Sequence, residues 1–499
     1  MSTLFELIEK ASGITCDSRQ VKPGDIFFAL KGRLTDGNQY VQEAVRHGAI
    51  AIVTDQPPPP LSIPVIVTAN ARKTLAEASA RFYNQPSRDL SVIGVTGTNG
   101  KTTITYMLEQ ILSHAGLKCG LIGTVKVNTG QQSFPSRLTT PDAISLHNYL
   151  AQMRANGVTH VPMEVSAQGV EMHRVDTLQF SCGILANISP DHLDFHGDFD
   201  SYFAAKKAFI NLLGKDTPLI INIGDPCCRT IASGFDGRLI TAGVNTKADI
   251  TASAISTHAY TSRFELSFGE LVTVTGQRLA PTRITVNLSV PGLHNIENAL
   301  LAAAAAIIHG VPVSSIAAAL ASFRCVERRM NIFHLNARTV IDDTALNPAS
   351  ISAVLNSLPT FRCRRLFVVN AIRGNRGAAI NQANAKVLAD YQKKLGFSLA
   401  ITASVGSVNS SDAVQFDEKA AFIKTLNHSQ VEYTYFSSLE SAISSALTQS
   451  RPNDLLALLG AQGMDAGRDI LTALTASSSP QPHALYSDAL TAHKLASAL

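Results

Sequence analysis

A glycine-rich segment that follows an apolar, β-branched run constrains the fold of this chain more than any other feature. Residues 92–103 read VIGVTGTNGKTT. The apolar run predicts a buried parallel strand over residues 90–95, and apolar residues at helical spacing predict a helix over 102–115. Gly97 and Gly100 let the backbone wrap closely around an anion, toward which the helix directs its free N–H groups. The segment therefore predicts a cradle for a nucleotide triphosphate.

The residues at the end of this loop have distinct expected tasks. Lys101 would neutralise the β- and γ-phosphates, and the Thr102 hydroxyl would hold Mg²⁺. The strict Walker pattern needs glycine at position 95, where this chain has Val95, so the loop is a variant. The alternative interpretation is a glycine-rich turn with a chance Gly-Lys-Thr, which the periodicity on both sides disfavours. The residues assigned to nucleotide binding here are Gly97, Thr98, Asn99, Gly100, Lys101, Thr102 and Thr103.

The length and composition indicate a multidomain globular protein. At 499 residues, three domains of ordinary size are expected. The 42 basic and 38 acidic residues are interspersed, which favours neither a nucleic-acid-binding surface nor contact with an anionic membrane. The seven cysteines form no C-x-x-C pair and no zinc-site spacing, so reduced thiols are expected. Because no signal peptide and no bilayer-length apolar run are recognisable, we expect a cytoplasmic protein without membrane insertion.

Strand and helix patterns alternate along the chain and divide it into three segments. A proline turn ends the first segment, which we predict to be a small α/β domain over residues 1–86. Apolar runs alternating with helical patterns predict a parallel sheet with crossover helices over 87–322, and the alternation repeats over 323–499. The predicted fold is therefore α/β with three domains, the last one Rossmann-like. The strands predicted for the second and third segments are 92–95, 121–125, 158–165, 182–185, 219–221, 339–341, 366–369, 399–402 and 455–459.

Further motifs follow in a fixed order, and together they resemble the Mur ligase family, most closely its MurE type. The resemblance covers nearly the whole chain. The segments that carry it are CDSRQVKPGDIFFALKGRLTDGNQY (16–40), GTNGKTT (97–103), TTP (139–141), MEVSAQGVEMHRV (163–175), NISPDHLDFHG (187–197), YFAAKKAF (202–209) and PGLHNIENALLAAAA (291–305).

The resemblance implies an ATP- and Mg²⁺-dependent ligase that forms an amide through an acyl phosphate and releases ADP and phosphate. The N-terminal domain would bind a UDP-N-acetylmuramoyl-dipeptide-like acceptor, and the central domain would bind ATP and two Mg²⁺ ions. The C-terminal domain would close on ATP and bind the incoming amino acid. Members of the MurE type add the third residue of the peptide in peptidoglycan synthesis, which would connect this chain with cell-wall biogenesis. A monomer is expected.

Two polar residues near strand ends are candidate Mg²⁺ ligands. Glu164 lies near the end of the apolar run 158–165 and His192 in a polar loop after the next strand, so both are expected to face the phosphates. The alternative interpretation makes Glu164 a helix-capping carboxylate and His192 a solvated loop residue. By resemblance, both bind the second Mg²⁺, and Lys206 is carbamylated and becomes a further metal ligand. Lys207 is the rival if the register shifts by one.

The residues that would bind the acceptor follow from the same resemblance. The turn around Ser18 combines a carboxylate, a hydroxyl and a guanidinium suited to bidentate phosphate contact, although a plain polar turn is the alternative. By resemblance, Ser18 contacts the uridine end, and Thr139 and Thr140 contact the sugar or diphosphate. Ser166 and Arg174 would hold the acceptor peptide.

The resemblance also places residues around the adenine and the γ-phosphate. Asn295 and Asn298 open an alanine-rich helix and resemble the positions that meet adenine, their alternative being helix capping. Arg329 is expected to contact the γ-phosphate, Asp343 to lie on the ATP side, and Asp465 to contact substrate. The residues expected to carry catalysis are Lys101, Lys206, His192 and Arg329.

The third segment departs from the family where the incoming amino acid would bind. The D-N-P-R signature is absent, and the comparable loop is 403–409 (ASVGSVN). The family's D-Y-A-H-T-P run reads DTALNP over 343–348, which keeps the acid and the proline but not the histidine. These losses argue against meso-diaminopimelate as the donor and leave L-lysine, another amino acid or a specialised amine open.

Three rival functions stay open. The first is a ligase of the same fold that acts on a different acid in specialised metabolism. The second is folylpolyglutamate-type ligation, which the extended DSR…KPGD segment disfavours. The third is a nucleotide-binding scaffold whose altered third domain has lost catalysis.

Overall fold

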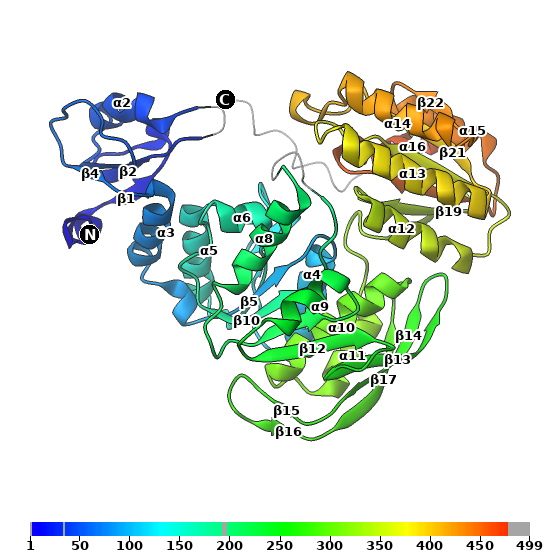
Figure 1. The fold of residues 1–499 in the computed structure, drawn as a ribbon, viewed down its shortest axis with the longest axis horizontal. Coiled ribbons are helices and arrows are strands. Elements are labelled where there is room, and N and C mark those ends of the chain that lie inside the picture. Colours follow the sequence, from blue (N-terminus) through cyan, green and yellow to red (C-terminus); the bar gives the residue numbers. More distant parts are fainter. Residues whose placement is uncertain (1, 33–34, 192–196, 478–499) are drawn as a thin grey trace, which may run out of the picture.

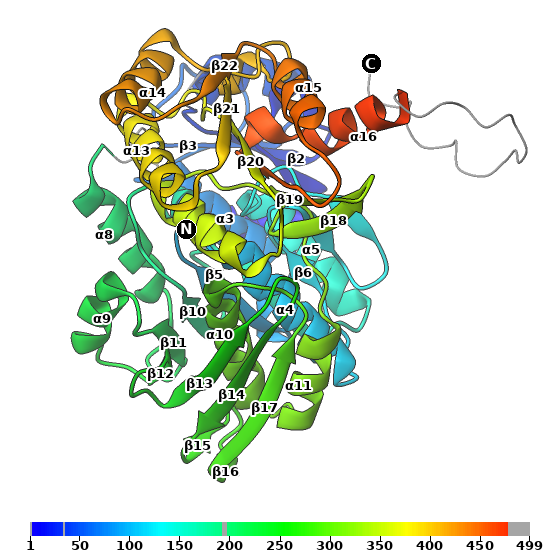
Figure 2. The same cartoon turned by 90° about the vertical axis from the view of Figure 1, so that its right-hand side faces the viewer.

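Three large sheets organise the computed structural model, which describes residues 2–32, 35–191 and 197–477. Figure 1 shows the N-terminal part at the upper left and the C-terminal part at the upper right, both above the central part. In Figure 2 the C-terminal part lies directly above the central one. Each sheet lies within one of the three predicted segments, and we propose residues 86/87 and 322/323 as the divisions between the domains.

The N-terminal domain is a four-stranded parallel sheet with helices packed on it. Its core contains Leu4, Phe28 and Leu75. The strands are β1 (Gly13–Thr15), β2 (Asp25–Ala29), β3 (Ala51–Thr54) and β4 (Val65–Val67). The helices are α1 (Ser2–Lys10), α2 (Val41–Arg46) and α3 (Ala71–Phe82), with 3-10 turns η1 (Ser18–Gln20) and η2 (Gly37–Tyr40).

The central sheet has eleven strands in the order β17-β14-β13-β12-β11-β10-β5-β9-β6-β7-β8. From β6 to β13 neighbouring strands pair in parallel, and antiparallel strands extend the sheet at both ends. The strands are β5 (Ser91–Thr96), β6 (Leu121–Ile122), β7 (Lys126–Asn128), β8 (Ser133–Pro135), β9 (His160–Glu164), β10 (Phe180–Leu185), β11 (Leu219–Asn222), β12 (Leu239–Val244), β13 (Ile250–Thr257), β14 (Ser262–Phe268) and β17 (Thr282–Leu288). A separate hairpin pairs β15 (Leu271–Val272) with β16 (Arg278–Leu279).

Helices on the central sheet fix the position of the glycine-rich loop. Ile104 and Leu108 of α4 and Ile296 of α10 belong to one buried apolar cluster, which ties the helix after the loop to the rest of the core. Because α10 is apolar around most of its circumference, it is buried along its length. The helices are η3 (Pro86–Arg88), α4 (Lys101–His114), α5 (Ala143–Ala155), α6 (Ala167–Glu171), α8 (Phe199–Ile210), α9 (Pro226–Ser233), α10 (Leu293–Ile308) and α11 (Val313–Ser322).

The C-terminal sheet has six strands in the order β18-β19-β23-β20-β21-β22, all parallel except the β18–β19 pair. The strands are β18 (Asn331–Leu335), β19 (Arg338–Asp343), β20 (Leu366–Ala371), β21 (Ser398–Thr402), β22 (Thr434–Phe436) and β23 (Leu455–Leu459). The helices are α12 (Pro348–Ser357), η4 (Leu358–Thr360), α13 (Ala378–Leu395), η5 (Ser410–Asp412), α14 (Phe416–His428), α15 (Leu439–Gln449), η6 (Gln462–Met464) and α16 (Gly467–Ser477).

The predicted three-domain α/β fold is confirmed, and the predicted strand over 121–125 is shortened. β6 ends at Ile122, because Gly123 starts a turn in which its N–H donates to the Lys126 oxygen at 3.1 Å. The Thr124 N–H donates instead to the Glu164 carboxylate, at 2.7 Å. A side chain at Gly123 would lie 2.5 Å from that carboxylate, so the turn needs glycine. The antiparallel strands between residues 250 and 288 were not among the predicted ones.

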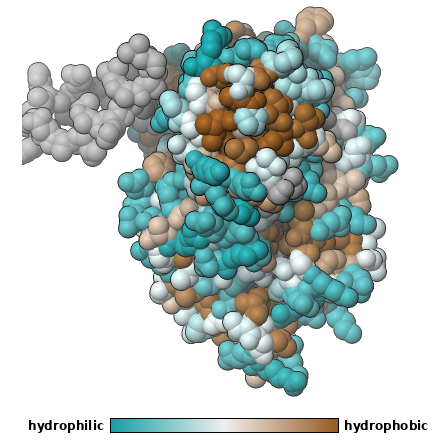
Figure 3. Space-filling view, turned by 90° about the vertical axis from the view of Figure 1, so that its left-hand side faces the viewer, coloured by the Kyte–Doolittle hydropathy of each residue, from teal (hydrophilic) through white to brown (hydrophobic). Residues whose placement is uncertain are grey.

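The surface adds two observations. Among the described residues, no helix is both long and apolar enough to cross a membrane. Figure 3 shows apolar side chains gathered near the top of one face, on the side of the N-terminal domain. In that domain, Val67 of the edge strand β4 is 53% exposed. Residues 478–499 lie outside the described residues.

Candidate active site

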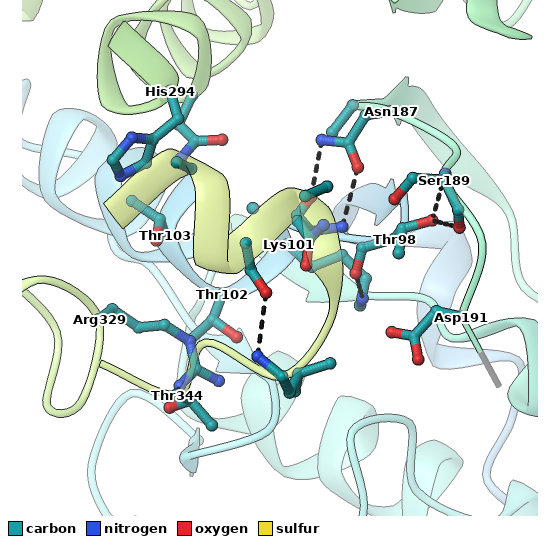
Figure 4. A pocket seen from close by; sticks show the side chains of 18 of the residues that line it. Thr98, Lys101, Thr102, Thr103, Asn187, Ser189, Asp191, His294, Arg329 and Thr344 are labelled. Carbon is teal, nitrogen blue, oxygen red and sulfur yellow. Dashed lines mark hydrogen bonds between the residues drawn. The ribbon is translucent and has the colours of Figure 1, made fainter. Parts of the chain in front are cut away.

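A cavity of about 500 Å³ lies between the central and C-terminal domains. It sits at the carboxyl ends of parallel strands, where α/β sheets usually bind ligands. Figure 4 shows Arg329 and Thr344 on one side of Lys101 and Thr102, with Asn187, Ser189 and Asp191 on the other. The predicted site residues that line the cavity are Thr98, Asn99, Gly100, Lys101, Thr102, Thr103, Thr139, Glu164, Asn295, Asn298, Arg329 and Asp343.

The glycine-rich loop joins β5 to α4 as predicted, and its glycines have positive φ. The φ angle is +150° at Gly97 and +88° at Gly100. A Cβ on Gly100 would lie only 2.4 Å from Asn298 Oδ1, so both conformation and space require glycine. Lys101 Nζ donates to the Gly97 and Thr98 oxygens at 2.9 and 3.0 Å, and burial lowers its pKa. The cation therefore lies against the loop that would enclose the phosphates.

Glu164 is fully buried and forms the centre of an oxygen-rich cluster. Its carboxylate accepts hydrogen bonds from Thr102 Oγ1 at 3.1 Å and from Thr124 N and Oγ1 at 2.7 and 3.0 Å. Thr124 Oγ1 also lies within hydrogen-bond distance of Thr139 Oγ1, at 3.0 Å. Among the described residues, no group of three acidic, histidine or cysteine side chains is arranged to hold a metal. The cluster still fits Mg²⁺, which takes one or two protein oxygens and completes its shell with phosphate and water.

The second predicted metal site is described in part, because His192 lies outside the described residues. Lys206 of α8 is 2% exposed, and its Nζ donates to the Gly97 oxygen at 2.9 Å. Burial, and then the nearby Lys101 charge, hold the pKa of Lys206 well below its ordinary value, against the attraction of Asp191. Lys207 is exposed, so Lys206 is the lysine of this pair that contacts the loop.

The predicted acceptor residues of the central domain lie together beside Glu164, although only Thr139 lines the cavity. Thr140 Oγ1 donates to the Glu164 backbone oxygen at 3.0 Å and accepts from Ser166 N at 2.9 Å. Arg174 Nη1 donates to the Thr140 oxygen at 2.8 Å. Burial lowers the pKa of Arg174. These contacts continue the site from the phosphate cradle toward the N-terminal domain.

Ser18 lies in the N-terminal domain, apart from the cavity. Its Oγ donates to Glu43 Oε2 at 2.6 Å, and its backbone oxygen contacts His47 Nδ1 at 2.8 Å. The neighbouring guanidinium of Arg19 pairs with Asp17, to which its Nε and Nη2 donate at 2.9 and 2.8 Å. The turn is thus internally bonded, and a diphosphate would have to compete with Asp17 for Arg19.

The C-terminal residues predicted from resemblance divide into two groups. Arg329 lines the cavity and donates to Thr344 Oγ1 and, at 3.0 Å, to the Arg328 oxygen. Asp343 accepts from Met330 N at 2.6 Å, and burial raises its pKa to about 6 although Arg329 opposes the rise. Asp465 instead is 63% exposed, pairs with Arg328 and does not line the cavity.

The site contains residues that the sequence analysis did not assign. Asn187 binds the loop backbone: it accepts from Asn99 N at 2.9 Å and donates to the Asn99 oxygen at 3.1 Å. Asp191 lies four residues on, and both belong to the motif NISPDHLDFHG, so a signal for them existed. His294 also belongs to a quoted motif, and burial lowers its pKa to about 4. Arg373 lines the cavity without any such signal.

Family models and curated relatives match this chain over most of its length. The models are those of the Mur ligase family catalytic domain (residues 10–84), the Mur ligase middle domain (95–306) and the Mur ligase glutamate ligase domain (328–462). The UDP-N-acetylmuramoyl-L-alanyl-D-glutamate–2,6-diaminopimelate ligase of Halalkalibacterium halodurans is 31% identical over 453 residues, 90% of this chain and 88% of that protein. The ligase of the same name from Geobacillus thermodenitrificans is 35% identical over 72% of this chain and 73% of its own.

Solved structures have the same fold. MurF from Acinetobacter baumannii matches with a TM-score of 0.70 at 20% identity, covering 95% of this chain and 98% of its own. The MurF ligase from Thermotoga maritima in complex with ADP matches with a TM-score of 0.68 at 18% identity, covering 95% and 100%. The chain therefore belongs to the Mur ligase family, whose members are ATP-dependent ligases that form carbon–nitrogen bonds.

Proposed function

We propose that this protein uses ATP to join an amino acid to the carboxylate of a UDP-N-acetylmuramoyl-dipeptide-like acceptor. The observation that carries the proposal is the continuity of contacts from Lys101 and Thr102 in the phosphate cradle, through Glu164, to Thr140 and Arg174. A carboxylate held near Thr140 would lie beside the γ-phosphate. The names of the relatives support the acceptor, since they act on UDP-N-acetylmuramoyl-L-alanyl-D-glutamate.

The reaction would begin with transfer of the γ-phosphoryl group from ATP to the acceptor carboxylate. A carboxylate oxygen forms a bond to phosphorus, the bond to the bridging oxygen breaks, and ADP keeps that electron pair. Lys101 and Arg329 lie where they would stabilise the charge on the transferring group. Mg²⁺, held by Glu164 and Thr102, would supply further charge neutralisation. The donor amine then attacks the acyl carbon, phosphate leaves and the amine loses a proton.

We further propose that Lys206 is carbamylated in the active protein. A neutral amine is the form that adds CO₂, and the depressed pKa of Lys206 favours that form. In this step the Nζ–C bond forms, one carbon–oxygen π bond of CO₂ breaks, and one proton is lost from the nitrogen, so the neutral amine becomes a carbamate anion. The anion would lie against the loop at Gly97, where an additional metal ligand is useful.

The donor amine is proposed to differ from the 2,6-diaminopimelate named for the relatives. The loop 403–409 lacks the D-N-P-R signature. In it Val405 is 64% exposed, and Ser404 is buried with a φ of +52°. 2,6-Diaminopimelate has two carboxylates, and an apolar loop tip offers no positive charge to bind the second one. A donor with a single carboxylate or none therefore fits this loop better.

The test is phosphate release by the purified protein with Mg²⁺, ATP, UDP-N-acetylmuramoyl-L-alanyl-D-glutamate and a panel of amino acids and diamines. We expect release that requires both acceptor and donor, with a product whose mass is the sum of the two minus water. Lys101→Ala should abolish it. Release with other acids but never with the muramoyl dipeptide would favour the ligase of specialised metabolism. Nucleotide binding without release for any pair would favour the non-catalytic scaffold.

A further inference from the structure

Two residues of the C-terminal domain bond to the central domain at or beside its phosphate loop. Asn347 Nδ2 donates to Asn99 Oδ1 at 3.0 Å, and Asn99 Nδ2 donates back to Asn347 Oδ1 at 3.2 Å. The same Asn347 Nδ2 also donates to Asp191 Oδ2 at 3.0 Å. Asn347 is fully buried. A single carboxamide from one domain therefore contacts the loop and an acidic residue of the other.

The second residue is Arg373, which forms an ion pair across the same boundary. Its Nη1 donates to Asp191 Oδ1 at 2.6 Å, so both oxygens of this carboxylate bond to the C-terminal domain. The side chains of Arg373 and Asp191 are 6% and 2% exposed. Charges withdrawn this far from water are tolerated only while they are paired. The pair therefore exists only when the two domains are docked. We call Asn99, Asp191, Asn347 and Arg373 the interdomain cluster.

The C-terminal domain presents both residues in fixed positions. Asn347 caps α12: its Oδ1 accepts from Ser350 N at 2.9 Å, and Ser350 Oγ accepts from Asn347 N at 3.0 Å. Asn381 brackets the backbone of Arg373, accepting from its N–H at 3.2 Å and donating to its oxygen at 2.8 Å. Such preorganisation lowers the entropy lost when the domains dock. Neither contact depends on the central domain.

The cluster also uses a residue in which this chain departs from the family pattern. Asn347 stands where the run D-Y-A-H-T-P has threonine. Threonine also caps a helix, somewhat less well than asparagine, but it has no NH₂ group to donate to Asn99 and Asp191 together. Asn347 therefore does more here than begin a helix.

We infer that Asn347 and Arg373 are positioning residues that make a competent phosphate loop depend on docking of the C-terminal domain. This rests on the proposed ligase reaction, in which an acyl phosphate must be kept from water until the amine attacks it. Docking places the Asn99 side chain and covers the loop beside Lys101. When the domains separate, the Asn99 side chain loses its partner and the loop is exposed to water.

Three variants test the inference. Arg373→Met removes the cation that pairs with Asp191 across the boundary. Asn347→Asp keeps the helix cap and the side-chain shape but places a carboxylate against Asp191, whereas Asn347→Thr keeps the cap and loses the donors. The control is Arg365→Met. Arg365 precedes β20 as Arg373 follows it, and it pairs at 2.8 Å with Asp454 of its own domain.

The first measurement needs no acceptor: small-angle scattering with and without Mg²⁺ and a non-hydrolysable ATP analogue. We expect the wild type and Arg365→Met to be compact with nucleotide. Arg373→Met and Asn347→Asp should shift the docked-to-open ratio by about 100-fold and remain expanded, because the first removes the ion pair across the boundary and the second places two carboxylates against each other there. Asn347→Thr should lie between. Equal compaction of all variants would overturn the inference, whether or not the protein proves to be a ligase.

The second measurement is phosphate released per amide formed, once a donor is identified. The ratio should stay near that of the wild type in Arg365→Met and rise at least about tenfold in Arg373→Met and Asn347→Asp, since water then reaches the acyl phosphate. A purely structural role would lower the unfolding temperature of all variants without changing this ratio. Absence of any amide product in the wild type would instead reject the proposed function.

Discussion

The side-chain nitrogens of Lys101 and Lys206 both donate to the backbone oxygen of Gly97, each at 2.9 Å. The two amines come from different helices and converge on one atom of the phosphate loop. Lys206 is buried and Lys101 is partly buried, and desolvation lowers the pKa of each amine. The pKa of Lys206 is lowered well below its ordinary value, because the positive charge of Lys101 adds to the effect of burial.

Replacement of Lys206 should separate its proposed carbamate from a structural role. We expect Lys206→Ala to lower kcat by about 10²–10³, the usual effect of removing one group that stabilises transition-state charge. A short carboxylic acid supplied in solution should restore part of the rate. Lys207→Ala, which changes the exposed neighbour, is the control and should keep its activity. Full activity of Lys206→Ala without rescue would reject the role.

Glu164→Gln should weaken the response to Mg²⁺. The amide keeps the size of the side chain and can still accept from Thr124, but it loses the negative charge at the centre of the cluster. In a titration of ATP turnover, the Mg²⁺ midpoint should rise at least about tenfold, equivalent to 1.4 kcal/mol of lost binding. Glu109→Gln removes a carboxylate that pairs with Lys126 on the outer side of α4, and its midpoint should not move. A midpoint unchanged in Glu164→Gln would contradict the metal assignment.

Gly100→Ala should destabilise the protein through both strain and overlap. Positive φ costs a residue with a side chain about 1–3 kcal/mol, and overpacking adds a similar amount. Gly116→Ala isolates the first effect, because Gly116 has a φ of +82° but nothing within 4 Å of the added Cβ. Urea unfolding should therefore show the larger loss in Gly100→Ala, together with weaker nucleotide binding. Equal losses in the two variants would mean that Asn298 moves aside at no cost.

The free energy of unfolding should fall as the pH rises through the range in which Asp343 ionises. Its pKa is about 6 in the folded protein against an ordinary value of 3.8, so the folded state holds the proton more tightly. Stability is then lost between about pH 4 and pH 6, by about 3 kcal/mol for two pKa units, and stays lost above pH 6. Asp343→Asn should flatten this part of the profile of unfolding free energy against pH. An unchanged slope would show that Asp343 is ionised throughout.

Sequence was sufficient where the interacting residues lie close in the chain. The strand, the glycine turn and Lys101 form one continuous segment, so periodicity and glycine spacing predicted β5, the loop and α4. The same reasoning could not predict Asn347 with Asn99 or Arg373 with Asp191, because 248 and 182 residues separate them. Lys206 was identified through resemblance alone, since a lysine in a helix has no distinguishing pattern of its own.

The sequence analysis did not predict strands in which polar residues interrupt the apolar pattern. The strands β13, β14 and β17 alternate buried and partly exposed residues at the end of the sheet, and their many serine and threonine residues interrupt the apolar runs by which the inner strands were recognised. The shortened β6 has another cause: the carboxylate of Glu164 takes the Thr124 N–H that a longer strand would give to its neighbour.

The ion pair between Arg373 and Asp191 has a consequence for the rate of turnover. Both charges are buried when the domains are docked. Each turnover must therefore open the domains and solvate the two charges before ADP can leave, and then dock the domains and desolvate the charges again before the next phosphoryl transfer. We therefore expect product release, rather than the chemical steps, to limit kcat. An added viscogen should then lower kcat of the wild type in proportion to the viscosity of the solution, and it should change kcat of Arg373→Met very little.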